Sequence, residues 1–115
     1  MARILLFFLC GNDADVIECP QYVADNLKSY QRKFDKWIYD RKNQHGYWVK
    51  DPADGGWAVC FDGEAFLNWL NNNVLTDGDE KAFFVSRNHI PTQEEKKYPQ
   101  IHFWCDPPKF FIDGI

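Results

Sequence analysis

Apolar and polar positions follow two different periods along this chain, and each period predicts a different kind of element. Residues Ile4–Cys10 form a continuous apolar run that ends at Gly11, Asn12 and Asp13, residue types that favour tight turns. Such a run predicts a first strand that is covered on both faces. The core of a secretory signal peptide is the alternative, but the run is at the minimum length for one.

The longest periodic segment begins at Pro20. Its apolar residues recur every three or four positions, as they do on one face of an α-helix: Val23, Leu27, Tyr30, Phe34, Trp37 and Ile38. Proline is tolerated in a first helical turn, and Arg41 and Lys42 stand late, where the helix dipole favours cations. With Gly46 as a stop signal, the spacing predicts a helix over 20–43.

The middle of the chain predicts a β-hairpin and then a second helix. Tyr47–Lys50 and Trp57–Phe61 are short aromatic and β-branched runs on either side of a turn rich in Pro, Asp and Gly. Asp62 is suited to cap the N-terminus of the helix. Helical spacing follows in Phe66, Leu67, Trp69, Leu70, Val74 and Leu75, and three consecutive asparagines, Asn71–Asn73, weaken the helix end.

The last third of the chain predicts two more strands, Ala82–Val85 and Ile101–Cys105, separated by a polar loop over 88–100. The expected order is therefore β-α-β-β-α-β, which is the order of a ferredoxin-like fold, with an extra C-terminal strand. We expect a single α+β domain over 1–115, in which two amphipathic helices cover one face of a sheet. A short α/β sheet with another strand order is the alternative.

Composition agrees with one globular domain of 115 residues, because 45% of the residues are hydrophobic and 26% are charged. Aromatic residues are frequent, at 17%, and no apolar stretch is long enough for a membrane helix. None of the four cysteines, Cys10, Cys19, Cys60 and Cys105, has CxxC spacing. We expect packed, reduced thiols and a cytoplasmic location, with two disulfides as the alternative.

Charge is unevenly distributed behind the net value of −4. The predicted first helix presents a row of cations, namely Lys28, Arg32, Lys33 and Lys36. Residues 51–80 contain no Lys or Arg but carry seven acids: Asp51, Asp54, Asp62, Glu64, Asp77, Asp79 and Glu80. Both sets are candidate binding surfaces, and an ordinary solvated surface is the alternative for each. The acidic balance disfavours a general nucleic-acid binder.

Spacing does not favour a metal or cofactor site. His102 and Cys105 are the one close His/Cys pair, and on a strand they would face opposite sides. The acidic stretch from Asp51 to Asp62 lacks the oxygen ligand at its third position and the glutamate at its twelfth that an EF-hand loop requires. Glycine-rich phosphate-binding motifs are missing. We therefore expect no metal and no cofactor.

A small enzyme with an unrecognised nucleophile remains an alternative. The parts for such a site are Cys10, Cys60, Ser29, Ser86, His89 and Asp106, but no local signature joins them. An enzyme of this kind would need a concave pocket in which at least two titratable groups lie within hydrogen-bond reach.

The acidic stretch gives the sharpest functional hypothesis. Carboxylates in this number complement a basic partner and speed association with it, and interleaved aromatics such as Trp69 add contact area. In size, acidity and aromatic content the chain resembles bacterial toxin-immunity proteins, such as those paired with contact-dependent growth-inhibition toxins. The resemblance implies a binding protein rather than an enzyme, which blocks a toxin, most readily a nuclease, encoded beside it. A nucleic-acid-associated protein that uses the Lys28–Lys36 row is the alternative; the leading interpretation involves no direct contact with nucleic acid or membrane.

Overall fold

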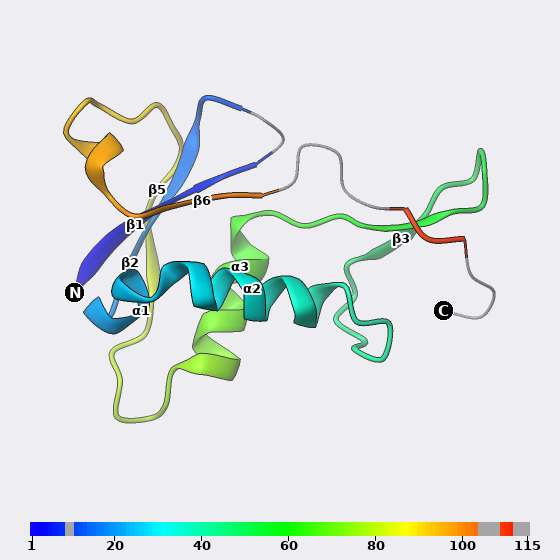
Figure 1. The fold of residues 1–115 in the computed structure, drawn as a ribbon, viewed down its shortest axis with the longest axis horizontal. Helices are drawn as coiled ribbons and strands as arrows, with labels where there is room; N and C mark the ends of the chain where they lie inside the picture. The colour runs from blue at the N-terminus through cyan, green and yellow to red at the C-terminus, as the bar shows by residue number, and fades with distance from the viewer. Residues whose placement is uncertain (9–10, 104–108, 112–115) are drawn as a thin grey trace.

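The computed structural model describes residues 1–8, 11–103 and 109–111. They form a small α+β domain in which helices pack on one face of a four-stranded mixed sheet, and a separate two-stranded hairpin extends from one end (Figure 1). The α+β fold class predicted from the sequence is confirmed. No helix in the described part of the chain is long and apolar enough to cross a membrane.

The sheet has the strand order β5-β2-β1-β6. Its central strands, β1 (Ala2–Phe7) and β2 (Ala14–Cys19), pair antiparallel, and both are largely buried. β5 (Phe83–His89) pairs antiparallel with β2, and β6 (Gln100–His102) pairs parallel with β1. The predicted first strand is therefore present at the centre of the sheet, but it spans Ala2–Phe7 instead of Ile4–Cys10, and residues 9 and 10 lie outside the described residues.

β2 was not predicted, and it changes the order of elements. The observed order starts with two strands and two helices, so the ferredoxin-like order is not confirmed. Asp15 and Glu18 interrupt the apolar residues of β2 and hide it in the sequence. The strand is stable despite a buried aspartate because β5 supplies partners for that carboxylate.

The helical side of the sheet holds the main core. Ile4, Leu6, Ile17 and Cys19 face α1 (Gln21–Asp25), α2 (Leu27–Ile38) and α3 (Gly63–Trp69). The centre of this core is aromatic: the Phe34 ring contacts four other rings edge-on, those of Phe61, Phe66, Trp69 and Phe103. Burial raises the pKa of the Cys19 thiol to about 11. Most of the unusual aromatic content therefore serves packing.

The helix predicted over 20–43 is split and ends early. Asn26 leaves helical geometry between α1 and α2, and its amide donates to the Tyr22 carbonyl. At the end of α2, side chains rather than further backbone N–H groups contact the last carbonyl oxygens. The Asn43 side-chain amide donates to the Trp37 carbonyl, and His45 Nε2 lies 2.8 Å from the Ile38 carbonyl oxygen. Helix propensity alone does not reveal that these side chains compete with the helix for its backbone carbonyls.

The second helix and the hairpin follow the prediction. Asp62 caps α3 by accepting the Glu64 N–H, and the asparagine run lies in a π-helical turn, η1 (Leu70–Val74). β3 (Trp48–Lys50) and β4 (Trp57–Val59) pair antiparallel. The segment 109–111 extends this hairpin, because Trp57 and Phe110 exchange two backbone hydrogen bonds.

The C-terminal third departs from its predicted boundaries. β5 continues past Val85 to His89, and the loop after it contains a short 3-10 turn, η2 (Glu95–Lys97). β6 begins at Gln100, and the end of the predicted strand Ile101–Cys105 lies outside the described residues. Cys19 and Cys60 are free thiols, so the alternative of two disulfides, which would need all four cysteines, is wrong; Cys10 and Cys105 lie outside the described residues.

Candidate functional site

The structure divides the seven predicted acids among three places. Asp51 and Asp54 lie in the hairpin turn, and Asp62 and Glu64 lie at the start of α3. Asp77, Asp79 and Glu80 lie in the turn that precedes β5. Figure 1 shows this turn and the hairpin turn at opposite ends of the molecule. The acids therefore do not form one continuous patch.

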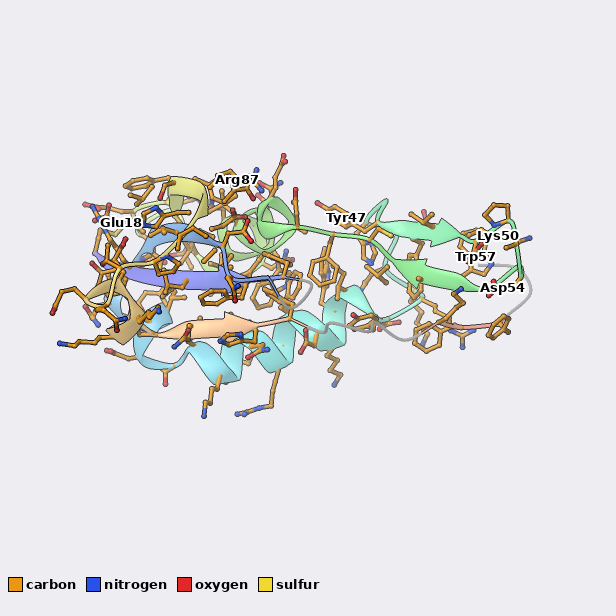
Figure 2. All side chains as sticks on the ribbon, turned by 90° about the horizontal axis from the view of Figure 1, so that it is seen from above. Glu18, Tyr47, Lys50, Asp54, Trp57 and Arg87 are labelled. Atoms are coloured by element: carbon orange, nitrogen blue, oxygen red, sulfur yellow. The ribbon has the colours of Figure 1, made fainter. Side chains whose placement is uncertain are left out.

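The hairpin acids are occupied by an internal cation. Lys109 Nζ lies 2.9 Å from Asp51 Oδ2 and 2.8 Å from Asp54 Oδ2 (Figure 2 labels Asp54). The hydrogen bond from Lys109 lowers the pKa of both carboxyls. The Lys109 stem packs over Gly56, where a Cβ would lie 2.5 Å from Lys109 Cδ. These two acids thus fasten the C-terminal segment to the hairpin.

The third group is partly structural as well. Asp79 Oδ2 accepts the Thr76 N–H at 2.8 Å and the Tyr22 hydroxyl at 2.9 Å, which ties the turn to α1. The Thr76 N–H is the main cause of its lowered pKa. Asp77 and Glu80 remain exposed. Trp69, the predicted aromatic contact, is only 5% exposed, so its ring lies in the core and is no surface anchor in this conformation.

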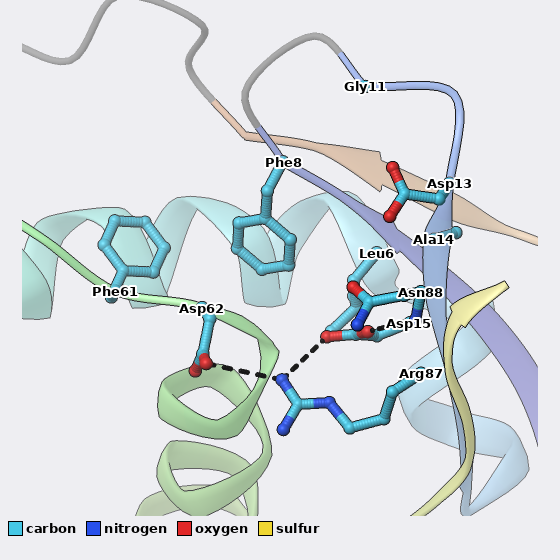
Figure 3. Close-up of a pocket in the computed structure, with 10 residues that line it drawn as sticks. All are labelled: Leu6, Phe8, Gly11, Asp13, Ala14, Asp15, Phe61, Asp62, Arg87 and Asn88. Atoms are coloured by element: carbon cyan, nitrogen blue, oxygen red, sulfur yellow. Dashed lines mark hydrogen bonds and ion pairs between the residues drawn. The ribbon is translucent and has the colours of Figure 1, made fainter.

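Asp62, at the start of α3, borders a pocket of about 550 Å³ (Figure 3), whereas Glu64 is not among the residues that line it. It opens where β1 ends, where β2 begins and where β5 ends. Among the described residues, its lining combines three carboxylates, one guanidinium and two phenyl rings with smaller groups: Leu6, Phe8, Gly11, Asp13, Ala14, Asp15, Phe61, Asp62, Arg87 and Asn88. A volume of this size falls within the range of roughly 300–1,000 Å³ that ligand sites occupy.

An ion pair between neighbouring strands forms one side of the pocket. Asp15, 5% exposed, accepts from Arg87 Nη2 at 3.1 Å and from the Asn88 N–H at 3.1 Å. Asn88 has a φ of 51°, at the irregular end of β5, and this turns its N–H toward the carboxylate. The Asp15 carboxylate also packs against Gly63, where a Cβ would collide with it.

Arg87 is shared between two carboxylates. The same nitrogen, Nη2, lies 3.4 Å from Asp62 Oδ2, while Asp62 Oδ1 caps α3 (Figure 3). The hydrogen bond that Arg87 donates to Asp15 raises the pKa of Arg87, and the guanidinium carbon lies 4.2 Å from the centroid of the Phe84 ring. With Asp13 included, three carboxylates and one permanent cation line the described part of the pocket. The pocket therefore attracts positive charge.

The apolar wall of the pocket suits the stem of a long side chain. The Phe8 and Phe61 rings meet edge to face with centroids 6.0 Å apart. A lysine or arginine can lay its methylene groups on such rings while its charged end approaches the carboxylates. Catalysis by Arg87 is disfavoured because a guanidinium held protonated transfers no proton, and the described residues that line this pocket include no Ser, Cys or His.

The described residues of the proposed nucleophilic site, Cys60, Ser29, Ser86 and His89, are not joined to one another by hydrogen bonds. His89 Nε2 lies 2.8 Å from Glu95 Oε1, and no hydrogen bond among the described residues joins His89 to Ser86, Ser29 or Cys60. Cys10 and Asp106 lie outside the described residues. The His102 ring stacks on the Phe7 ring, with centroids 4.6 Å apart. No group of three His, Cys, Asp or Glu side chains within the described ranges is placed to hold a metal ion.

Sequence reasoning found Asp62 but missed the groups around it. Asp13 was assigned only to a turn, and Asp15, Arg87 and Asn88 were not singled out. An aspartate inside an apolar segment was the available signal, because a buried carboxylate requires a partner. Its partner lies 72 positions away, at Arg87, and no short-range pattern connects the two.

The predicted basic row is present on one helix. Lys28, Arg32, Lys33 and Lys36 are all exposed on α2, and we refer to them as the basic ridge. Comparison with protein-family models, curated proteins and solved structures gives no match for this chain.

Proposed function

We propose that this chain is a protein-binding inhibitor of the immunity type. In this proposal it acts in the cytoplasm and neutralises a toxin domain, most readily a nuclease, encoded beside its own gene. A nuclease presents a cationic surface to bind phosphate, and a carboxylate-lined surface competes for that surface directly.

One observation supports this proposal best. The carboxylates of Asp13, Asp15 and Asp62 line a pocket that has two phenyl walls, and a single guanidinium pairs with two of them, Asp15 and Asp62. Because Arg87 compensates one carboxylate, a net negative charge remains at the mouth, and Glu64 adds a further exposed acid beside it. We infer that basic side chains of the toxin approach at this place. The acids of the hairpin turn contribute less, because Lys109 holds both carboxylates in ion pairs and compensates one of their two charges.

Co-expression tests the proposal. The product of the neighbouring gene is expressed from an inducible promoter with and without this chain, and growth and complex formation are measured. We expect growth arrest without the chain, rescue with it, and a complex of one copy of each protein that survives gel filtration. A neighbouring product that is harmless, or that stays toxic and unbound in the presence of the folded chain, contradicts the proposal.

A matched pair of variants separates the pocket from general acidity. Asp13→Lys with Glu64→Lys reverses one acid that lines the pocket and one exposed acid two residues after Asp62, and it leaves the Asp62 cap intact. Asp77→Lys with Glu80→Lys makes the same change in net charge at the distant turn. Rescue should be weakened by the first pair and retained by the second. Equal rescue by both pairs removes the pocket from the proposed interface.

A further inference from the structure

The basic ridge is the largest group of charges that the proposed inhibitor function leaves unused. Lys28, Arg32 and Lys36 recur every four residues, and Lys33 lies beside them. On a helix this spacing places all four on the side opposite the buried Leu27, Phe34 and Ile38. Figure 2 shows long side chains projecting from the outer side of this helix into solvent.

None of these four cations has an acidic partner within the described residues. Arg87 and Lys109, by contrast, lie near acidic groups of the chain, and each pairs with two carboxylates. Asp35 is on the same helix but is half-buried, and burial raises its pKa to about 6. No ion pair among the described residues joins it to the ridge, so the four positive charges remain uncompensated.

We propose that the basic ridge binds the phosphate backbone of a single-stranded nucleic acid. A rise of about 1.5 Å per residue makes the row from Lys28 to Lys36 about 12 Å long, enough for several consecutive phosphates. Lysine and arginine on an exposed helix face contact phosphates at little cost, since neither cation has to break an ion pair. The site is separate from the pocket and does not depend on the inhibitor function.

Two features favour a single strand over a duplex. The rest of the chain is acidic, and a rigid duplex crossing the ridge would meet that negative surface, whereas a flexible strand can follow the helix alone. The half-exposed Tyr30 ring lies beside the ridge, with Lys33 Nζ 5.3 Å from its centroid. An aromatic ring next to a row of cations is a platform on which an unpaired base stacks.

Fluorescence anisotropy with a labelled single-stranded RNA of about 12 nucleotides tests this directly. We expect saturable binding at low salt that weakens as salt rises, with a log–log slope of about −3 for four contacts. Lys28→Glu with Arg32→Glu should weaken binding at least about tenfold and flatten the slope. Tyr30→Leu should weaken binding several-fold without changing the slope.

The matched control is Lys96→Glu with Lys97→Glu, which makes the same change in net charge on the exposed turn η2. Circular dichroism confirms that each variant is folded. Binding that survives in the η2 variant and is lost in the α2 variant supports the proposal. No saturable binding, equal loss in both variants, or tighter binding to a duplex of the same length overturns it. Rescue from the toxin should be unchanged in the α2 variant, so the two functions are tested separately.

Discussion

Arg87 Nη2 on β5 lies 3.1 Å from Asp15 Oδ2 on β2, although 72 positions separate the two residues in the sequence. This ion pair stabilises a buried carboxylate in the sheet and fixes the irregular end of β5 through the Asn88 N–H. It also sets the distance between the sheet and α3, because Gly63 packs directly on the carboxylate. The pocket is therefore a consequence of how one buried charge is satisfied.

Removal of the cation should destabilise the fold more than removal of the pair. In Arg87→Met the Asp15 carboxylate keeps the Asn88 N–H but loses its charged partner. We expect the free energy of unfolding to fall by about 2 kcal/mol, which is less than for a fully buried pair because Arg87 is half-exposed. Urea unfolding at neutral pH measures the change. The double variant Asp15→Asn with Arg87→Met should recover part of the loss. If Arg87→Met is as stable as the parent, the ion pair does not contribute to stability.

The contact between Gly63 and Asp15 predicts that alanine at position 63 lowers the stability of the protein, whereas helix propensity alone predicts that it raises it. Alanine is the better helix former, yet Gly63→Ala should destabilise the protein by about 1–3 kcal/mol because its methyl group collides with a carboxylate that Arg87 and Asn88 hold in place. Gly78→Ala is the control, since nothing lies within 4 Å of its added Cβ, and it should change stability by less than about 0.5 kcal/mol. Thermal unfolding compares the two variants.

Asp35 should make the protein less stable as the pH rises. Burial raises its folded pKa to about 6 from an ordinary 3.8, so the favourable protonated form is present below pH 3.8 and is lost as the pH rises through 6. Asp35→Asn should therefore stabilise the protein at pH 7 by about 1 kcal/mol, a value discounted for partial exposure. The gain should vanish near pH 4. A gain that is the same at both pH values contradicts this explanation.

Glu95 has the opposite dependence. The His89 hydrogen bond lowers its pKa to about 2, with the Thr92 N–H as a second contribution. Because the folded pKa lies below the ordinary value of 4.5, this pair contributes stability above pH 4.5 and loses it as the pH falls through 2. His89→Ala should raise the Glu95 pKa toward 4.5, which a carboxyl carbon NMR titration measures. An unchanged pKa would assign the effect to Thr92 alone.

Local signals predicted local structure well. The N-cap at Asp62 and the hairpin around residues 51–56 depend on residues close together in sequence, and both are present. β2 was missed because Asp15 breaks its apolar pattern, and the partner that makes this tolerable comes from β5. The end of α2 was placed too late because the Asn43 and His45 side chains compete for its last carbonyls.

The candidate site was only partly accessible from the sequence for the same reason. The seven acids suggested one acidic surface, but Lys109 pairs with two of them from more than fifty positions away and compensates one of their two charges. Trp69 was expected at the surface, and its helical position turns it into the aromatic core. Pairing between distant segments determines which charges remain free, and periodicity contains no information about that pairing.

The association rate with the toxin encoded beside the chain tests the central claim most directly. Stopped-flow mixing at low salt compares Asp13→Asn with Glu64→Gln against Asp77→Asn with Glu80→Gln, two pairs that change the net charge equally. The pocket pair should slow association about tenfold and flatten its salt dependence, because attraction at the pocket steers the encounter. The distant pair should stay within about twofold of the parent rate. Equal rates for the two pairs would contradict the claim that the pocket formed by Asp13, Asp15, Asp62 and Arg87 is the surface that meets the partner.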